Sequence, residues 1–322
     1  MKKIIIAGAN GFLGRYLSRY FAQQGWEVVG FARRQKGIDN QCRFVEWDGK
    51  TLGDWAGELD GCDVLVNLAG RSVNCRYNEA NKREIHDSRV DSTRVLGDAI
   101  TACENPPELW MNSSTATIYR HAEDKPQSDV GEIGKGFSVE IAKAWEEAFF
   151  SANVPGKVRK VALRTAMVLA DEPGTVFRYL YNLARFGLGG KVGNGKQMVS
   201  WIHVDDFCRA IEWLIDHDEI SGPINVTAPD PIPNAEVMRR FRKHAGMPIG
   251  LPATKWMAEV GAFVLRTETE LVLKSRWVVP TRLQEHGFVF KHPEMDLSSF
   301  CSEETKLSSV LHSAQCNYTE TS

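Results

Sequence analysis

The sequence lacks an excess of charge of either sign. Lysine and arginine number 39 against 41 aspartate and glutamate, so the formal net charge is −2 over 322 residues. A nucleic-acid groove needs a concentrated positive field, and the one basic cluster, at Arg239, Arg240, Arg242 and Lys243, has the spacing of a solvated helix face. The composition excludes an electrostatic nucleic-acid binder.

The sequence also lacks a disulfide or metal pattern and a long apolar run. Its seven cysteines are scattered and show no CxxC or Cys/His spacing, so we interpret them as reduced thiols and expect no metal site. The apolar start is interrupted by Asn10, Gly11 and Arg15 before it reaches the length of a secretory signal. No window approaches about 18 uninterrupted apolar residues. We therefore expect a cytoplasmic protein without a membrane segment.

Short β-rich runs alternate with helix-length segments through the first half of the chain. The apolar runs predict strands at 3–7, 26–31, 44–47, 64–68, 109–112 and 160–168. Helical patterns follow the first run and recur at 92–103 and 140–150. This alternation is typical of parallel βαβ units whose strands are buried on both faces. The predicted fold class is α/β, a Rossmann-type doubly wound parallel sheet.

Three glycines, Gly8, Gly11 and Gly14, lie between the first strand and the first helix. Gly8 permits a tight turn, Gly11 lets the backbone approach a pyrophosphate, and Gly14 allows the helix to pack closely on the strand. The unpaired N–H groups at the start of the helix then face the phosphates. An ordinary strand-to-helix turn is the alternative, but the position of the motif favours a dinucleotide site.

Arginines stand where a dinucleotide-binding sheet recognises the adenosine ribose. At the end of the second strand an Asp or Glu would bind both ribose hydroxyls of NAD, whereas this chain has Arg33 and Arg34. Guanidinium groups suit a 2′-phosphate, so NADP is favoured over NAD, and two solvated surface arginines are the alternative. Asp48, which closes the third strand, is either an acceptor for the adenine amino group or only a turn residue.

Changes in composition mark the expected domain boundaries. Five glycines fall within 187–195, a strand-like pattern resumes at 199–204, and three prolines lie at 229–233. Two helical stretches and the run 287–290 follow. We predict an NADP-binding Rossmann domain at 1–170, completed by about 201–228, and a smaller substrate-side and C-terminal domain at 171–200 and 229–300. The Ser/Thr-rich end, 301–322, is predicted to be a mobile tail.

Several sequence blocks together resemble a known family. They are the glycine motif at 8–14, Asn67 to Gly70, Lys82 to Thr93, Asn112 to Tyr119, Ala144 to Glu147, 187–190 with 200–206, 222–229 and 279–290. With them the chain resembles the extended short-chain dehydrogenase/reductases, the superfamily of nucleotide-sugar epimerases and dehydratases. More narrowly, it resembles an atypical epimerase-like subgroup with a C-terminal domain of unknown function, over roughly residues 3 to 298. Together, the motifs above and the resemblance predict cofactor contacts at Gly8, Asn10, Gly11, Phe12, Leu13, Gly14, Arg33, Arg34, Asp48, Leu68, Ala69, Gly70, Arg89, Ser113 and Lys143.

The resemblance also implies a catalytic set that this chain only partly retains. In that superfamily a Ser or Thr, a Tyr and a Lys move the proton while a hydride passes to or from the nicotinamide. Thr115 matches the hydroxyl residue and Lys143 matches the lysine, but Val139 stands where YxxxK requires tyrosine. Because Val139 and Lys143 are one helical turn apart, the resemblance predicts that Val139 points at the nicotinamide pocket.

Other residues near these motifs are candidate replacement proton donors. Ser138 and Glu140 flank the vacant position, whereas packing roles are favoured for His203 and Tyr119. Asp205 and Asp206 are typical of a helix N-cap and first-turn acid. The segment 190–196 imitates a phosphate loop, but Gln197 replaces the required hydroxyl residue, so we interpret it as a hairpin on the substrate side.

These patterns predict an NADP-dependent oxidoreductase or epimerase-like protein. It would act by hydride transfer on a nucleotide-sugar or another small metabolite that carries a hydroxyl or carbonyl group. The alternative is a catalytically silent NADP(H)-binding or sensing module, and Val139 is the residue that favours it.

Overall fold

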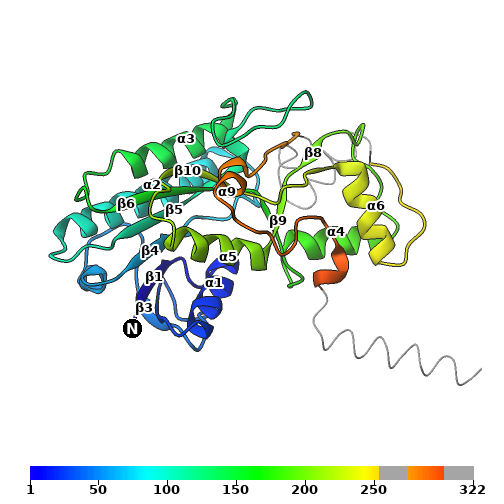
Figure 1. The fold of residues 1–322 in the computed structure, drawn as a ribbon. Helices are drawn as coiled ribbons and strands as arrows, with labels where there is room; N and C mark the ends of the chain where they lie inside the picture. Colours follow the sequence, from blue (N-terminus) through cyan, green and yellow to red (C-terminus); the bar gives the residue numbers. More distant parts are fainter. Residues whose placement is uncertain (254–273, 301–322) are drawn as a thin grey trace, which may run out of the picture.

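The computed structural model of the chain describes residues 1–253 and 274–300, and a seven-stranded sheet forms its centre (Figure 1). In chain order the strands are β1 (Lys3–Ala7), β2 (Glu27–Ala32), β3 (Arg43–Glu46), β4 (Val64–Asn67), β5 (Leu109–Thr115), β6 (Arg159–Thr165) and β10 (Gly222–Val226). All are parallel, in the order β10-β6-β5-β4-β1-β2-β3. The predicted doubly wound parallel sheet is confirmed.

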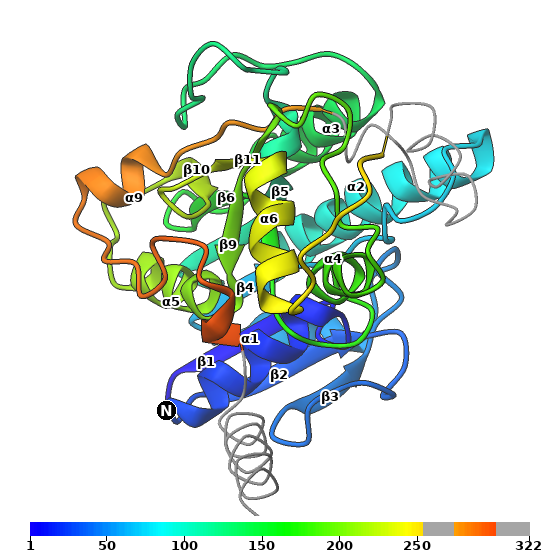
Figure 2. The same ribbon diagram turned by 90° about the vertical axis from the view of Figure 1, so that its right-hand side faces the viewer.

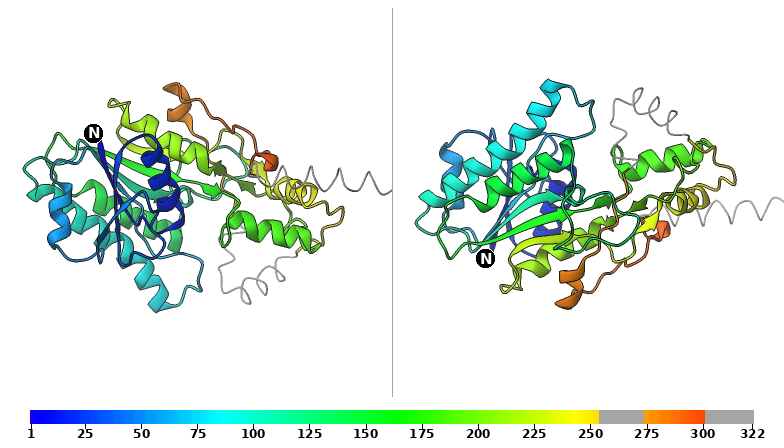
Figure 3. Two further views of the ribbon diagram at one scale, coloured as in Figure 1. Left: turned by 90° about the horizontal axis from the view of Figure 1, so that it is seen from below. Right: turned by 90° about the horizontal axis from the view of Figure 1, so that it is seen from above.

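Helices cover both faces of this sheet, as the two views of Figure 3 show. Consecutive strand residues supply the two faces, because Ile4 belongs to one apolar core and Ile5 to the other. Phe21 and Phe207 pack in the first core, and Ile100 and Phe149 pack in the second. These four residues come from α1 (Phe12–Gln23), α5 (Val204–Ile215), α2 (Glu79–Ala102) and α3 (Phe137–Phe150) respectively.

A smaller group of elements lies beyond the carboxyl ends of the strands (Figure 2). Phe177, Trp201, Phe241 and Phe300 are buried together in its core. The group comprises β7 (Met167–Leu169), α4 (Val176–Arg185), β8 (Met198–Val199), β9 (Trp201–His203), β11 (Ile232–Pro233), α6 (Asn234–His244) and η3 (Leu297–Phe300). β7 pairs in parallel with β9, and β8 pairs antiparallel with β11. Three further short helices are η1 (Asp54–Leu59), η2 (Ala116–Ile118) and α9 (Thr281–Glu285).

Several predicted boundaries are wrong. The strand expected at 160–168 ends at Thr165, because the next strand, β7, pairs with β9 and not with the central sheet. The expected strand at 199–204 is two short strands, and Val204 already opens α5.

The helix expected at 92–103 begins at Glu79, where the side chain of Asn78 caps it by accepting the N–H of Asn81. Likewise, α3 begins at Phe137, three residues before the expected start at 140.

The run 287–290 packs back onto the main core, where Phe288 meets Trp213 with ring centroids 5.7 Å apart. The predicted tail and part of the second helical stretch, at 254–273, lie outside the described residues. In the part of the chain that is described, no helix is long and apolar enough to cross a membrane. The five cysteines of that part are all unpaired.

Candidate dinucleotide site

The candidate site lies where the strand order reverses. β1 has β2 on one side and β4 on the other, which makes the carboxyl ends of β1 and β4 the switch point where such sheets bind ligands. The turns that follow these strands meet, since a Cβ added to Gly8 would lie 3.0 Å from the backbone nitrogen of Ala69. A cleft of about 610 Å³ opens here, and it is lined by the predicted residues Gly8, Asn10, Gly11, Arg33, Asp48, Leu68, Ala69 and Gly70.

The three glycines of the first turn have separable roles. Gly8 has φ +83°, a conformation that favours glycine. A Cβ on Gly14 would lie 2.4 Å from the carbonyl oxygen of Gly8, so this glycine is needed for the close packing of helix on turn. Gly11 is exposed in the cleft, and a Cβ there would meet only the Gly8 oxygen, at 3.2 Å. The open side of Gly11 therefore faces the space that a ligand would fill.

The start of α1 is suited to an anion. Its N-cap is Gly11, no side chain caps it, and its first turn contains no acidic residue. The N–H groups of Phe12 and Leu13 belong to the first turn, which has no intrahelical acceptors. They therefore give a partial positive charge to the helix start at Gly11, which lines the cleft.

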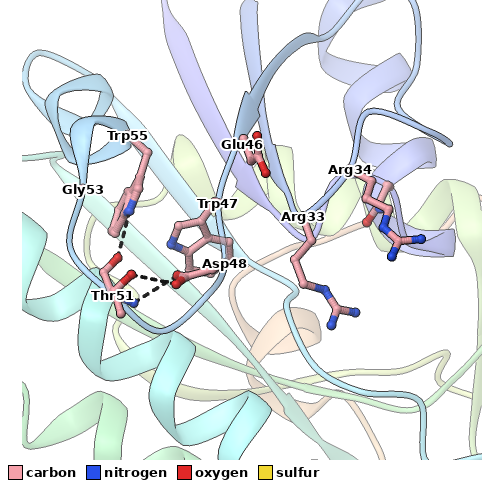
Figure 4. A pocket seen from close by; sticks show the side chains of 9 residues that line it. Arg33, Arg34, Glu46, Trp47, Asp48, Thr51, Gly53 and Trp55 are labelled. Atoms are coloured by element: carbon pink, nitrogen blue, oxygen red, sulfur yellow. Dashed lines mark hydrogen bonds between the residues drawn. The ribbon is translucent and has the colours of Figure 1, made fainter.

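A second hollow of about 650 Å³ adjoins the cleft at the ends of β2 and β3 and includes Arg33, Arg34 and Trp47 in its lining. Figure 4 shows the two arginines leaving the end of β2 opposite Trp47 and Asp48. Both arginines are exposed. This arrangement provides two cations at the position where an adenosine 2′-phosphate would lie.

Asp48 forms a turn. Its Oδ1 accepts the N–H of Lys50 at 2.8 Å. Figure 4 shows its bonds with Thr51, whose N–H donates to Oδ1 at 3.0 Å and whose hydroxyl donates to Oδ2 at 2.6 Å. Hydrogen bonding to Thr51 lowers the pKa of Asp48. Of the two interpretations left open by the sequence, the hydrogen bonds favour the turn residue, with the carboxylate still at the edge of the pocket.

A buried amide network holds the turn after β4. Asn67 donates from Nδ2 to Asn112 Oδ1 at 2.7 Å, and its Oδ1 accepts the N–H of Ala69 at 3.0 Å. The hydroxyl of Thr93 on α2 joins the same network and accepts from the indole N–H of Trp145 at 3.1 Å. The network therefore ties β4, β5, α2 and α3 together directly beneath the cleft.

Arg89 places a positive charge beside this turn. Its guanidinium lies over the Trp145 ring and donates to the carbonyl oxygens of Arg71 and Ile85 at 3.0 Å. Burial lowers the pKa of Arg89 to about 10. A Cβ on Gly70 would lie 3.3 Å from the guanidinium carbon, so the cation lies immediately under the cleft wall, where phosphate oxygens would lower its desolvation cost.

The two predicted catalytic residues are present on neighbouring elements. Thr115 ends β5, and its hydroxyl lies 3.0 Å from the hydroxyl of Thr117. Lys143 is exposed on α3, with Nζ 3.2 Å from the carboxylate of Glu140. Ser113 is partly buried two residues before Thr115. Among the described residues, Glu140 is the ion-pair partner of Lys143. The catalytic roles of Thr115 and Lys143 stay predictions.

Val139 does not face an open pocket, contrary to the prediction. Its side chain is 0% exposed and packs in an apolar cluster with Ala116, Ile118 and Val278. Val278 belongs to the segment before α9, so the C-terminal part of the chain covers this position. The space that a tyrosine would occupy is filled by packing.

Two of the considered replacement donors have structural roles. Tyr119 is 0% exposed, and its hydroxyl donates to Asn225 Oδ1 at 2.8 Å and accepts from Arg164 at 2.9 Å. His203 caps α5 by accepting the N–H of Asp205 at 3.0 Å. Ser138 and Glu140 lie in the first turn of α3, where Glu140 is exposed. Neither His203 nor Tyr119 lines the cleft.

The cleft includes residues that sequence reasoning missed. Lys50 and Arg71 follow the ends of β3 and β4 and bring positive charge. Glu84 and Asp87 on α2 bring negative charge, with Glu84 paired to Arg71, and Ser88 and Ser92 line the cleft from the same helix. The two serines are one helical turn apart, a spacing that would have indicated a common face had α2 been predicted from residue 79.

Comparison with known proteins identifies the family. Residues 4–227 match the model of the NAD dependent epimerase/dehydratase family, which is more than half of the chain. The chain belongs to this family. Residues 253–297 match a second model, described as a domain of unknown function.

Relatives in the epimerase/dehydratase family align along almost the whole chain. An epimerase family protein of Mycobacterium leprae is 30% identical over 292 residues, which is 90% of this chain and 92% of the relative. The crystal structure of the human epimerase family protein SDR39U1 with NADPH superimposes with a TM-score of 0.79 at 27% identity, covering 91% of this chain and 96% of that one. A nucleoside-diphosphate sugar epimerase from Corynebacterium glutamicum gives 0.72 at 27% identity, covering 99% and 67%.

Proposed function

We propose that this chain binds NADP(H) across the carboxyl ends of β1, β2 and β4. The observation that carries the proposal is the pair of adjoining hollows along which an uncapped helix start, a glycine turn and two exposed arginines follow one another. The pyrophosphate would lie on the N–H groups of Phe12 and Leu13, and the 2′-phosphate would lie on Arg33 and Arg34. The human relative solved with NADPH supports this choice of cofactor.

Calorimetric titration of the protein with NADPH and with NADH tests this proposal. We expect tighter binding of NADPH, because a charge-assisted pair to a phosphate contributes roughly 1.5 to 3 kcal/mol. Replacing both arginines by alanine (Arg33→Ala with Arg34→Ala) is expected to narrow the preference at least about tenfold. The matched control is Arg19→Ala, since Arg19 is an exposed arginine of α1 that pairs with Asp39 and lines neither hollow. Equal affinity of the unmodified protein for both cofactors would overturn the proposal.

The reaction we propose is hydride transfer with a nucleotide-sugar or another small metabolite that carries a hydroxyl or carbonyl group. The nicotinamide would supply the hydride chemistry when bound. Thr115 would orient the substrate oxygen with its hydroxyl, and Lys143 would hold the ribose after leaving Glu140. The elements of the smaller group, α4, α6 and β8, would form the substrate side, since they lie beyond the carboxyl ends of the strands.

A second candidate function is a catalytically silent NADP(H)-binding module. Val139 favours it, because an aliphatic side chain cannot transfer a proton. Val139 is also buried against Val278, so it does not leave an open space for another donor. General acid catalysis contributes roughly 10² to 10⁴-fold, so tyrosine-assisted turnover is expected to be absent. A screen of carbonyl and alcohol metabolites at the absorbance band of reduced nicotinamide distinguishes the two functions. Turnover that Thr115→Ala and Lys143→Met reduce supports the enzyme, whereas cofactor binding without turnover supports the silent module.

A further inference from the structure

A second polar cluster lies outside the dinucleotide site, at the start of α5. His203 ends β9, Asp205 lies in the first turn of α5, and His292 follows α9 in the chain. Asp205 Oδ2 lies 3.8 Å from His203 Nδ1 and 3.5 Å from His292 Nε2. The three possible ligand atoms all lie within 4.8 Å of one another, and none of these residues lines the cleft.

We propose that His203, Asp205 and His292 bind a divalent transition-metal ion of the zinc type. Two imidazole nitrogens and one carboxylate oxygen form a ligand set that Zn²⁺ accepts, with water as the fourth ligand. Ligand atoms at about 2.0 to 2.2 Å from a tetrahedral ion stand roughly 3.3 to 3.6 Å from one another. The separation of 3.5 Å lies within this range, and the separation of 3.8 Å lies slightly above it.

Hydrogen bonding prepares the His203 ring for this role. Its Nδ1 accepts the N–H of Asp205 at 3.0 Å, which fixes the neutral tautomer with the lone pair on Nδ1 and the proton on Nε2. The ion would take over the lone pair that the backbone N–H now uses.

An unpartnered buried atom points to a missing ligand. The Nε2 atom of His292, which lies 3.5 Å from Asp205 Oδ2, is buried and has no hydrogen-bond partner among the described residues. The two rings are stacked with centroids 3.8 Å apart, so the His292 ring would turn to direct this nitrogen at an ion held by His203 Nδ1.

Two charged neighbours determine how the site would be held and opened. Asp206 is fully buried and accepts the backbone N–H groups of Lys291 and His292 at 2.9 and 2.7 Å, which fixes this segment against α5. Lys291 Nζ lies 3.1 Å from Asp205 Oδ2, and the Lys291 side chain is 60% exposed. Lys291 therefore neutralises Asp205 when no ion is bound and is able to swing into solvent when one enters. A bound ion would fasten the C-terminal segment to the start of α5.

The test is a calorimetric titration of the chelator-treated full-length chain with ZnCl₂, together with the absorption spectrum of the Co²⁺ form. We expect one equivalent of Zn²⁺ and a Co²⁺ spectrum without thiolate charge transfer. His292→Gln and Asp205→Asn are expected to weaken binding at least about tenfold, while Lys291→Met, which removes the competing cation, is expected to tighten it severalfold.

Melting of each metal-free variant checks the fold, and His292→Gln and Lys291→Met decide the question if Asp205→Asn does not fold.

His86→Gln is the matched control, because His86 also lies beside an aspartate, with Nδ1 2.9 Å from Asp87 Oδ1, but on the exposed surface of α2. It is expected to leave Zn²⁺ binding unchanged. The proposal is overturned if the unmodified chain binds no stoichiometric Zn²⁺, if His86→Gln weakens binding as much as His292→Gln, or if the Co²⁺ spectrum shows thiolate ligation.

Discussion

Gly11 and Gly14 are three residues apart in one turn, yet a side chain would meet different surroundings at the two positions. At Gly14 a Cβ would collide with backbone atoms, 2.4 Å from the Gly8 oxygen and 2.6 Å from the Ala9 Cα. At Gly11 it would face the cleft and meet only the Gly8 oxygen, at 3.2 Å. Glycine is therefore needed at position 14 for folding and at position 11 for the proposed ligand.

This difference gives a prediction for Gly11→Val. We expect NADPH binding to be lost, because the added carbons would occupy the space of the pyrophosphate, while the melting temperature of the free protein changes little. Gly57→Val is the control, since Gly57 is exposed in η1 and a Cβ there meets nothing within 4 Å. Calorimetry and thermal melting of both variants check the prediction. Normal NADPH binding by Gly11→Val, or its unfolding, would contradict it.

Sequence reasoning located those candidate residues that directly follow a strand. Gly8 follows β1, Arg33 follows β2 and Leu68 follows β4, so a correct strand prediction was enough to place them at one edge of the sheet. Val139 could not be placed in this way, because the residue that buries it, Val278, is far along the chain. The cluster of His203, Asp205 and His292 was missed for the same reason, since His292 is far along the chain from the other two residues.

At the scale of elements, Glu58 of η1 joins two strands at the amino end of the sheet. Its carboxylate accepts hydrogen bonds from the two terminal guanidinium nitrogens of Arg43 on β3, at 2.7 and 2.6 Å. It also pairs with the amine of Lys3 on β1 at 3.1 Å. These partners, led by Arg43, lower the pKa of Glu58 to about 2 from its ordinary 4.5. The charged form of Glu58 is therefore stabilised by folding.

Glu58→Gln is expected to lower the free energy of unfolding by about 1 kcal/mol at neutral pH, because the pairs are partly exposed. A folded-state pKa below the unfolded value means that the contribution is present above about pH 4.5 and is lost as the pH falls toward 2. Urea unfolding of both proteins between pH 7 and 2 measures the difference. Glu79→Gln is the control, since Glu79 pairs with Lys82 but is 86% exposed. A difference that does not shrink on acidification would refute the assignment.

Some element boundaries were predicted wrongly because they depend on strand pairing or on a helix cap. Neither of these produces a periodic pattern of apolar residues in the sequence. The polar first turns of α2 carry no apolar stripe, and the helix start depends on the cap at Asn78. The break after Thr165 arises because β7 pairs with β9, more than thirty residues later, and not with the central sheet. By contrast, the five strands from β1 to β5 were found within one or two residues of their starts, because each is a buried run bounded by turn residues.

At the scale of the whole molecule, the side chain of Arg15 connects the glycine turn after β1 to the smaller group of elements. Arg15 on α1 donates to the carbonyl oxygen of Asn10 at 3.1 Å and also pairs with Glu172. The backbone oxygen of Glu172 in turn accepts the hydroxyl of Thr175, which caps α4, at 2.7 Å. The turn that would hold the pyrophosphate is thereby linked to the first turn of α4.

This connection predicts that NADPH binding slows hydrogen exchange in segments outside the cleft as well as within it. A ligand at about 100 times its dissociation constant stabilises the folded state by roughly 2.7 kcal/mol, so hydrogen exchange is expected to slow in β1 and α1 and, through Arg15, at 170–178. In Glu172→Gln the neutral side chain loses the ion pair, and we expect protection to remain in β1 and α1 but to disappear at 170–178, with NADPH affinity changed less than about threefold. Exchange measured by mass spectrometry, with and without NADPH, decides between these outcomes. Glu123→Gln is the control, because Glu123 lies near His121 on the exposed surface and contacts neither α1 nor α4. If protection at 170–178 is the same in Glu172→Gln as in the unmodified chain, the link between the two parts is carried by the shared packing of the cores and not by Arg15.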